Sequence, residues 1–293
     1  MTDNNRRHLI FATSFSDACH AAIPSVARIV DALSARLTIL HVYDPQKKTF
    51  REVDSMLHSF FAEADNYPHC ERQLVSGSVF EGITEFCRHQ RDALLFLPAS
   101  DRIGRPRPFH RSLRTRIIRA LPASMWTLNQ TQKIGSSYGR VKHVAAWLTC
   151  PEEGLDHVRQ AAAHAEMMDA TLHLLHVVPD VHEGMLGSTM FSAAPLGTEY
   201  ATTWLKKIAE QLPNHHNVKI HVTQGHRRRM LGRLLRQSQA ELLMVSRQSA
   251  LQHDFFRAAL NPTLEDCSSA LICIAQESSS LWTKAGLGSL RPA

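Results

Sequence analysis

The stretch ARLTILHVYDP at residues 35–45 returns later in the chain as ATLHLLHVVPD at residues 170–180, an offset of 135. The same offset relates RRHLIFATSFSDA to VKHVAAWLTCPEE. Residues 75–99 match residues 223–247 at an offset of 148, and SMWTL matches ALICI at an offset of 146. Each repeated unit spans about 130 residues, an ordinary domain size and far longer than a solenoid repeat. The chain is therefore a duplicated domain.

The duplication predicts two domains joined by a short linker. Copy one is expected at residues 1–130, the linker at 131–142, copy two at 143–276 and a flexible tail at 277–293. A chain of 293 residues with 44% hydrophobic residues can bury two cores of ordinary size.

Apolar strands alternate with helical periodicity in both copies. The order predicts right-handed crossovers, so each copy should be a Rossmann-like α/β domain, a five-stranded parallel sheet with helices on both faces. A helix is expected over 50–65, and a loop rich in Gly, Ser, Ala and Pro over 179–198. The expected strands are 8–12, 37–43, 70–76, 93–98 and 125–129 in copy one, and 143–148, 171–177, 218–223, 241–246 and 270–275 in copy two.

Ligands of such sheets bind beyond the carboxyl ends of the strands, an edge here called the rim. The rim residues carry a family resemblance. FATSFSDACHAAI (11–23), the strand endings TILHV and HLLHV, and the block LLFLPASDRIG…RSLRTRIIRALPASMWTL (94–128) resemble the universal stress protein (UspA) family in its tandem form. The resemblance implies an adenine nucleotide alpha hydrolase-like fold. It also implies pairing of the last strands of the two copies, MWTLN and LICIA, in an intramolecular pseudo-dimer.

ATP-binding members of that family carry G-x-x-G, nine residues and G-[ST] after the fourth strand, and an Asp at the end of the first. In copy one Pro98, Asp101 and Arg111 stand at the glycine positions, Ser14 stands at the Asp position, and Ser112 matches. Proline removes a backbone donor and a side chain blocks the close approach that glycine permits. Copy one is therefore not expected to hold ATP in the family's usual way.

Copy two departs from the pattern at the same places. Ser246 and Ser249 replace the first two glycines, the loop is two residues shorter, and Thr149 replaces the Asp. The candidate ligand-binding residues at the two rims are Ser14, Val42, Arg102, Gly104, Arg105, Arg107, Arg111, Ser112, Thr149, Val177, Ser246 and Ser249.

The net charge of +6 comes from one segment, because residues 102–119 hold seven Arg and no acid. These guanidinium groups could bind an anion bidentately, or they could form a solvated basic loop paired with acids of another domain or subunit. Helix-turn-helix and zinc-finger patterns do not accompany the charge, so nucleic acid is not the expected partner.

Catalytic and metal motifs are missing from the sequence. It contains no H-E-x-x-H, G-x-S-x-G or C-x-x-C. His173 and His176 are three apart on a predicted strand, so they point to opposite faces and cannot share a metal. His215, His216, His221 and His226 are expected at the surface, with a weak metal site as the alternative.

These observations favour a non-catalytic stress-response protein. Its partner would be a protein or a small anionic ligand, and it would have no resident cofactor. The alternative is an ATP-binding protein or slow ATPase with an Arg-lined site in copy one. No apolar run can span a bilayer and the amino terminus does not resemble a signal peptide, so a cytoplasmic location is expected.

Overall fold

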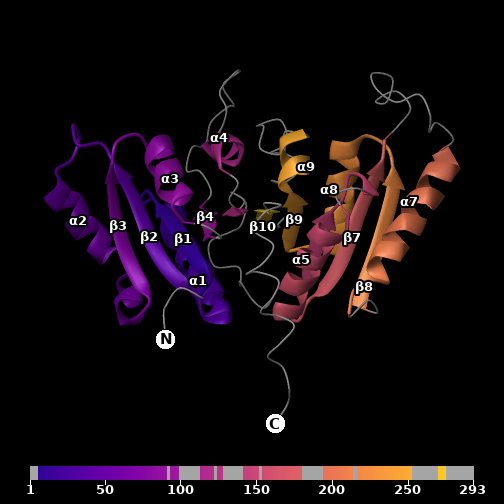
Figure 1. Cartoon of the computed structure of the whole chain (residues 1–293), viewed down its shortest axis with the longest axis horizontal. Helices are drawn as coiled ribbons and strands as arrows, with labels where there is room; N and C mark the ends of the chain where they lie inside the picture. The colour runs from indigo at the N-terminus through magenta and orange to yellow at the C-terminus, as the bar shows by residue number, and fades with distance from the viewer. Residues whose placement is uncertain are drawn as a thin grey trace, which may run out of the picture. The chain divides into compact units, whose positions relative to one another are not determined.

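The structure, a computed structural model, divides the chain into two compact units, Met1–Tyr138 and Gly139–Ala293. The division falls inside the predicted linker. The residues described are 6–90, 93–98, 113–121, 124–127, 141–151, 154–179, 194–213, 217–252 and 270–274. Each unit is a parallel α/β domain (Figure 1).

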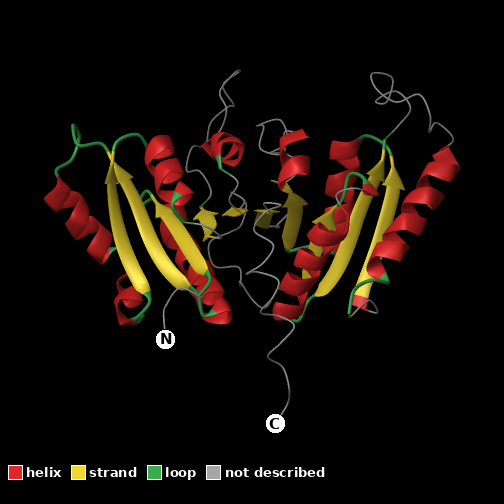
Figure 2. Cartoon of the chain, in the orientation of Figure 1, coloured by secondary structure: helices red, strands yellow, loops and turns green. Residues whose placement is uncertain are grey.

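Copy one is a five-stranded parallel sheet in the order β3-β2-β1-β4-β5 (Figure 2). Its strands are β1 (His8–Thr13), β2 (Arg36–Tyr43), β3 (Cys70–Ser76), β4 (Ala93–Leu97) and β5 (Ser124–Thr127). Its helices are α1 (Asp17–Leu33), α2 (Phe50–Ser59), the 3-10 helix η2 (Ala62–Asn66), α3 (Val79–Arg88) and α4 (Leu113–Ala120).

Copy two repeats this topology with the order β10-β9-β6-β7-β8, again parallel. Its strands are β6 (His143–Trp147), β7 (Thr171–Val178), β8 (Val218–Gln224), β9 (Leu242–Ser246) and β10 (Ala270–Ile274). Its helices are α5 (Gly154–Met167), α7 (Ala194–Ala209), α8 (Arg227–Ser238) and α9 (Arg247–Gln252). The predicted fold class and strand positions are confirmed in both copies.

The centre of each sheet is apolar on both faces. All six residues of β1 are buried, and so are all five of β9. Phe11 of β1 packs edge-on against Phe96 of β4 with ring centroids 5.6 Å apart. Such burial on both faces is what a central parallel strand requires, because helices cover it from either side. None of the helices within the described residues is long and apolar enough to cross a membrane.

Two predicted boundaries are wrong. The single helix expected over 50–65 breaks at Phe60 and Phe61, which take extended and left-handed conformations. Both side chains are buried, so the break turns two large rings toward the core at once. The loop expected over 179–198 is also too long, because α7 already begins at Ala194. Pro195 lies in its first turn, where the missing N–H has no intrahelical role.

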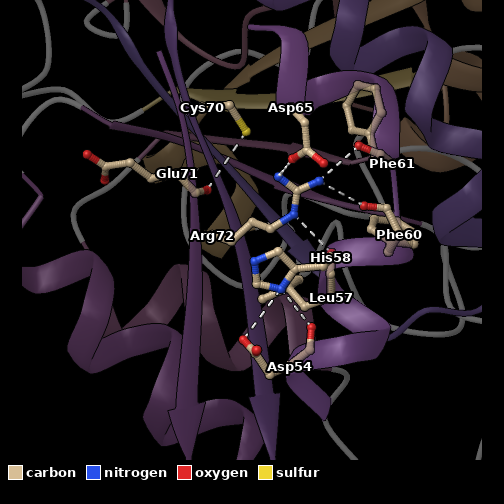
Figure 3. A network of polar contacts seen from close by, with 9 residues as sticks. All are labelled: Asp54, Leu57, His58, Phe60, Phe61, Asp65, Cys70, Glu71 and Arg72. Atoms are coloured by element: carbon tan, nitrogen blue, oxygen red, sulfur yellow. Dashed lines mark hydrogen bonds and ion pairs between the residues drawn. The ribbon is translucent and has the colours of Figure 1, made fainter. Parts of the chain in front are cut away.

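Arg72 of β3 holds the broken helix against the sheet (Figure 3). Its Nε donates to the Leu57 carbonyl at 3.0 Å and its Nη2 to the Phe61 carbonyl at 3.1 Å, with a longer bond to the Phe60 carbonyl. The guanidinium also pairs with the Asp65 carboxylate. Carbonyls at a helix end lack intrahelical donors, so this one side chain satisfies the end of α2.

We expect the substitution Arg72→Met to lower the stability of copy one by about 2–4 kcal/mol, because it leaves several carbonyls without their donor. Equilibrium denaturation by urea measures this loss. The matched control is Asp65→Asn, which removes only the exposed end of the pair and should cost less than about 1 kcal/mol. Equal losses in the two variants would contradict a capping role for Arg72.

Candidate functional site

The rim of copy one is formed by the turn between β1 and α1. Phe15 in this turn has φ of 61°, a left-handed conformation that costs an aromatic residue on the order of 1–3 kcal/mol. Its N–H donates to Thr13 Oγ1 at 3.1 Å, and its ring stacks on His41 with centroids 4.1 Å apart. The strained backbone therefore places an aromatic ring over the end of β2.

Ser14, the residue at the expected Asp position, belongs to a local network with a thiol. Its N–H donates to Cys19 Sγ at 3.3 Å, and its hydroxyl donates to Ser16 Oγ at 3.2 Å. Ser16 also caps α1 and lies 3.4 Å from the same sulfur. Burial acts to raise the pKa of Cys19, but the hydrogen bonds from Ser14, Ser16 and Thr13 outweigh it, so the pKa is lowered. The polar groups of this turn therefore form hydrogen bonds to one another.

Val42 and Val177, candidates at the ends of β2 and β7, are buried core residues. A Cβ placed on Gly82 of α3 would lie 2.8 Å from Val42 Cγ1. The backbone of α3 therefore packs directly on Val42, and this close approach explains the glycine.

Most of the Arg-rich candidates lie outside the described residues. These are Arg102, Gly104, Arg105, Arg107, Arg111 and Ser112. Pro98 is described, and its carbonyl accepts a hydrogen bond of 3.0 Å from Arg114 Nη2. Burial lowers the pKa of Arg114 to about 10. Arg116, two residues after Arg114, places its guanidinium 4.0 Å from the centre of the Phe80 ring.

In copy two the structure brings three predicted site residues together. Thr149 Oγ1 lies 3.0 Å from Ser249 Oγ, and the Ser249 N–H donates to Ser246 Oγ at 3.0 Å. Ser246 and Ser249 are buried and Thr149 is half-buried. We call these three residues the hydroxyl chain. It links the end of β6 to the end of β9 across the rim.

The segment expected to be a loop after β9 begins as a helix. β9 ends at Ser246 and α9 begins at Arg247, with no turn between them. The segment RQSALQ contains no glycine and several strong helix formers, which explains the difference. A glycine-rich loop exposes backbone N–H groups to a phosphate, whereas the residues of α9 place the Ser249 N–H on Ser246 instead.

The histidine that precedes each rim valine was not among the candidate ligand-binding residues. His41 Nδ1 lies 2.8 Å from the Thr13 carbonyl, and His176 Nδ1 lies 2.9 Å from the Leu148 carbonyl. A carbonyl only accepts, so Nδ1 carries the proton in both rings. Burial lowers the pKa of His41 although the Thr13 carbonyl favours the charged form. The repeated phrase L-H-V was the available signal for this shared feature.

Comparison with known proteins relates copy two to a protein family. Residues 142–269 match the model of the universal stress protein family. Copy two is therefore similar to the universal stress protein family over nearly its whole length. A comparison with curated proteins finds no match.

Metal chemistry gains no support, because no group of three His, Cys, Asp or Glu within the described residues is placed to hold an ion.

Solved structures show that the fold extends over both copies. A candidate universal stress protein from Pseudomonas aeruginosa UCBPP-PA14 is similar at a TM-score of 0.57 and 11% identity, covering 96% of this chain and 98% of its own. A universal stress protein from Archaeoglobus fulgidus DSM 4304 is similar at a TM-score of 0.54 and 10% identity, covering 93% of this chain and 99% of its own. At such identities the likeness concerns the fold alone.

We expect Ser249→Ala to destabilise copy two by about 1–2 kcal/mol, because it removes a buried partner of Thr149. The unfolding transition of copy two in urea reports this loss. Ser14→Ala is the matched control, since Ser14 is the counterpart of Thr149 but is exposed. It should change the stability of copy one by less than about 0.5 kcal/mol. A silent Ser249→Ala variant would argue against a structural role for the hydroxyl chain.

Proposed function

We propose that this universal stress protein is a non-catalytic regulatory binding protein in which neither copy binds ATP in the family's usual way. It would act in a stress response through a protein partner or a small anionic ligand, in the cytoplasm and without a resident cofactor. The observation that carries the proposal is the hydroxyl chain of copy two, together with the helix that replaces the loop after β9.

The hydroxyl chain argues against a phosphate in copy two for a physical reason. A phosphate cradle depends on several backbone N–H groups that are held open toward the anion. Here the N–H of Ser249 is already bonded within the chain, and both serines are buried. An incoming phosphate would have to break these bonds and displace the start of α9.

Copy one supports the proposal at the position expected to be acidic. Ser14 cannot supply the carboxylate that ATP-binding relatives place there, and its polar groups are engaged with Ser16 and Cys19. Phe15 adds a ring stacked on His41 beside it. The rim of copy one therefore consists of polar groups that hydrogen-bond to one another and of aromatic rings.

Arg114 favours a second candidate, an anionic ligand in copy one. Burial lowers the pKa of this guanidinium, which shows that the loss of water disfavours its charge. Its described partner is a neutral carbonyl, that of Pro98. An anion near the start of α4 would compensate the buried charge, so ATP or another phosphate compound remains the alternative ligand of copy one.

The test for ATP is isothermal titration calorimetry of the full chain with ATP and Mg²⁺ at neutral pH. We expect no binding with micromolar or better affinity. The variant Ser249→Gly, which opens the hydroxyl chain, is titrated in parallel. Binding by this variant alone would show that the hydroxyl chain blocks the site. Micromolar binding by the parent protein would refute the proposal.

The test for an anion uses thermal stability at constant ionic strength. We expect phosphate to raise the melting temperature of copy one more than chloride does, because it can neutralise clustered guanidinium groups. Changing Arg105, Arg107 and Arg111 to Gln should remove most of this gain. Sulfate should act like phosphate, and because part of its effect is general salting-out, the triple variant is the control that separates the two. If the triple variant responds to phosphate like the parent, the segment is a solvated basic loop.

We also propose that the two copies pair through their last strands as an intramolecular pseudo-dimer. It rests on the resemblance of both copies to a family that commonly dimerises in this way.

A further inference from the structure

Three histidines on neighbouring strands of copy two are joined ring to ring. His143 Nδ1 of β6 lies 3.1 Å from His173 Nε2 of β7, and His173 Nδ1 lies 2.9 Å from His221 Nε2 of β8. The rings of His173 and His221 are within 23° of parallel with centroids 5.1 Å apart, and the ring of His143 is tilted by 70° to that of His173. We call these three residues the histidine stripe.

The stripe lies on the face of the sheet opposite the rim histidine. His176 contacts Trp204 of α7, and residues three apart on a strand point to opposite faces, so His173 faces away from α7. Right-handed crossovers place α8 on that second face, and α8 packs against β6, β7 and β8. His173 is 3% exposed, whereas His143 and His221 are half-buried.

Among the described residues, no carboxylate forms an ion pair with the rings of the stripe. Lys219 of β8 is the register partner of His173 and shares its face. The Glu241 carboxylate, before β9, accepts the backbone N–H groups of Lys142 and His143. On α8 from Leu231 onward, the cationic residues Arg233 and Arg236 are exposed, and the buried residues are Leu231, Gly232, Leu234, Leu235 and Ser238.

Counting protons shows why acid must disturb the stripe. The two links between rings need one proton each, and only the outer nitrogens of His143 and His221 can carry a further proton without breaking a link. The intact stripe therefore holds at most four ring protons, one more than three neutral rings. Three histidines in water take up three more, so the folded stripe excludes at least two protons that the unfolded chain binds in acid.

We propose that the histidine stripe is a pH-sensitive latch that fastens the edge strand β8 to β7 and releases it when the medium turns acidic. β8 stands at the end of the strand order of copy two and is paired with β7. An edge strand is held from one side only, so the loss of the link from His173 to His221 bears directly on it. This inference does not depend on the proposed function.

The pKa values agree with this geometry. Burial lowers the pKa of His173 to about 4, and His221, His143 and Lys219 add to the effect. Burial and Lys219 also lower the pKa of His221. Unfolded histidine titrates near 6.5, so the stripe contributes its full stability above about pH 6.5. That contribution declines as the pH falls from 6.5 toward 4, because the unfolded state then binds more protons.

The experiment is hydrogen–deuterium exchange of the full chain at pH 7.5 and pH 5, corrected for the intrinsic exchange rate at each pH. Copy one supplies an internal control, because its edge strand β3 has Gln73 at the position of His221 and β2 has Thr38 at the position of His173. At pH 5 each excluded proton weakens the folded state about 30-fold. We expect the protection of residues 218–224 to fall between about tenfold and about 10³-fold more than that of residues 70–76.

The variant His173→Thr/His221→Gln copies the residues of copy one into copy two and should reduce the acid response of β8 to that of β3. If this double variant does not fold, His221→Gln decides alone, since that side chain is half-buried. The exposed His58→Gln is the neutral control. The proposal is overturned if β8 and β3 of the parent respond equally to acid, or if the folded variant keeps the parent's response.

Discussion

Parallel pairing of a fully buried central strand is the constraint on which each copy depends. β1 pairs with β2 on one side and β4 on the other, and β6 pairs with β7 and β9 in the same way. Such a strand satisfies its backbone through its neighbours and leaves both faces apolar, so helices must cover both. The same constraint brings the carboxyl ends of four or five strands to one edge. The rim exists because the core is built this way.

The sequence predicts the features that follow from local pattern. Continuous apolar runs locate the strands, and the duplicated phrases L-H-V align the two copies, because both signals depend only on neighbours in the chain. The break at Phe60 and Phe61 is not predictable in this way, since helical periodicity continues through it. It depends on Arg72, which is more than ten residues away and reaches the freed carbonyls only in the folded sheet. The helix α9 was missed because the family pattern suggested a loop there.

The positions of the candidate residues at the strand ends follow from the sequence, but the hydrogen bonds between them do not. The sequence placed Ser14, Thr149, Ser246 and Ser249 at the rims, and the structure brings the last three into contact. What the sequence could not show is that these hydroxyl groups bond to one another. Short polar side chains that replace glycine and Asp lose the geometry for a large anion, but they still need partners when buried. The two rims meet this need differently, one with a thiol and one with a threonine.

The amino-terminal ends of the strands, which lie opposite the rim, also differ between the two copies. In copy one Arg36 Nη2 donates to His8 Nδ1 at 3.0 Å, so His8 Nε2 carries the proton and donates to Thr38 Oγ1 at 2.7 Å. A fixed cation therefore holds His8 neutral, and burial together with Arg36 lowers its pKa to about 4. At the matching positions copy two has His143 and His173.

This replacement changes the chemistry of the sheet without changing its backbone. A threonine accepts a hydrogen bond and has no proton equilibrium near neutrality, whereas an imidazole in the same place couples the strand to pH. His173 and His176 lie on one strand but on opposite faces, so the proton-sensitive stripe and the rim can vary separately. A duplicated domain allows this, because one copy can pair a single histidine with a threonine while the other joins two histidines at the same positions.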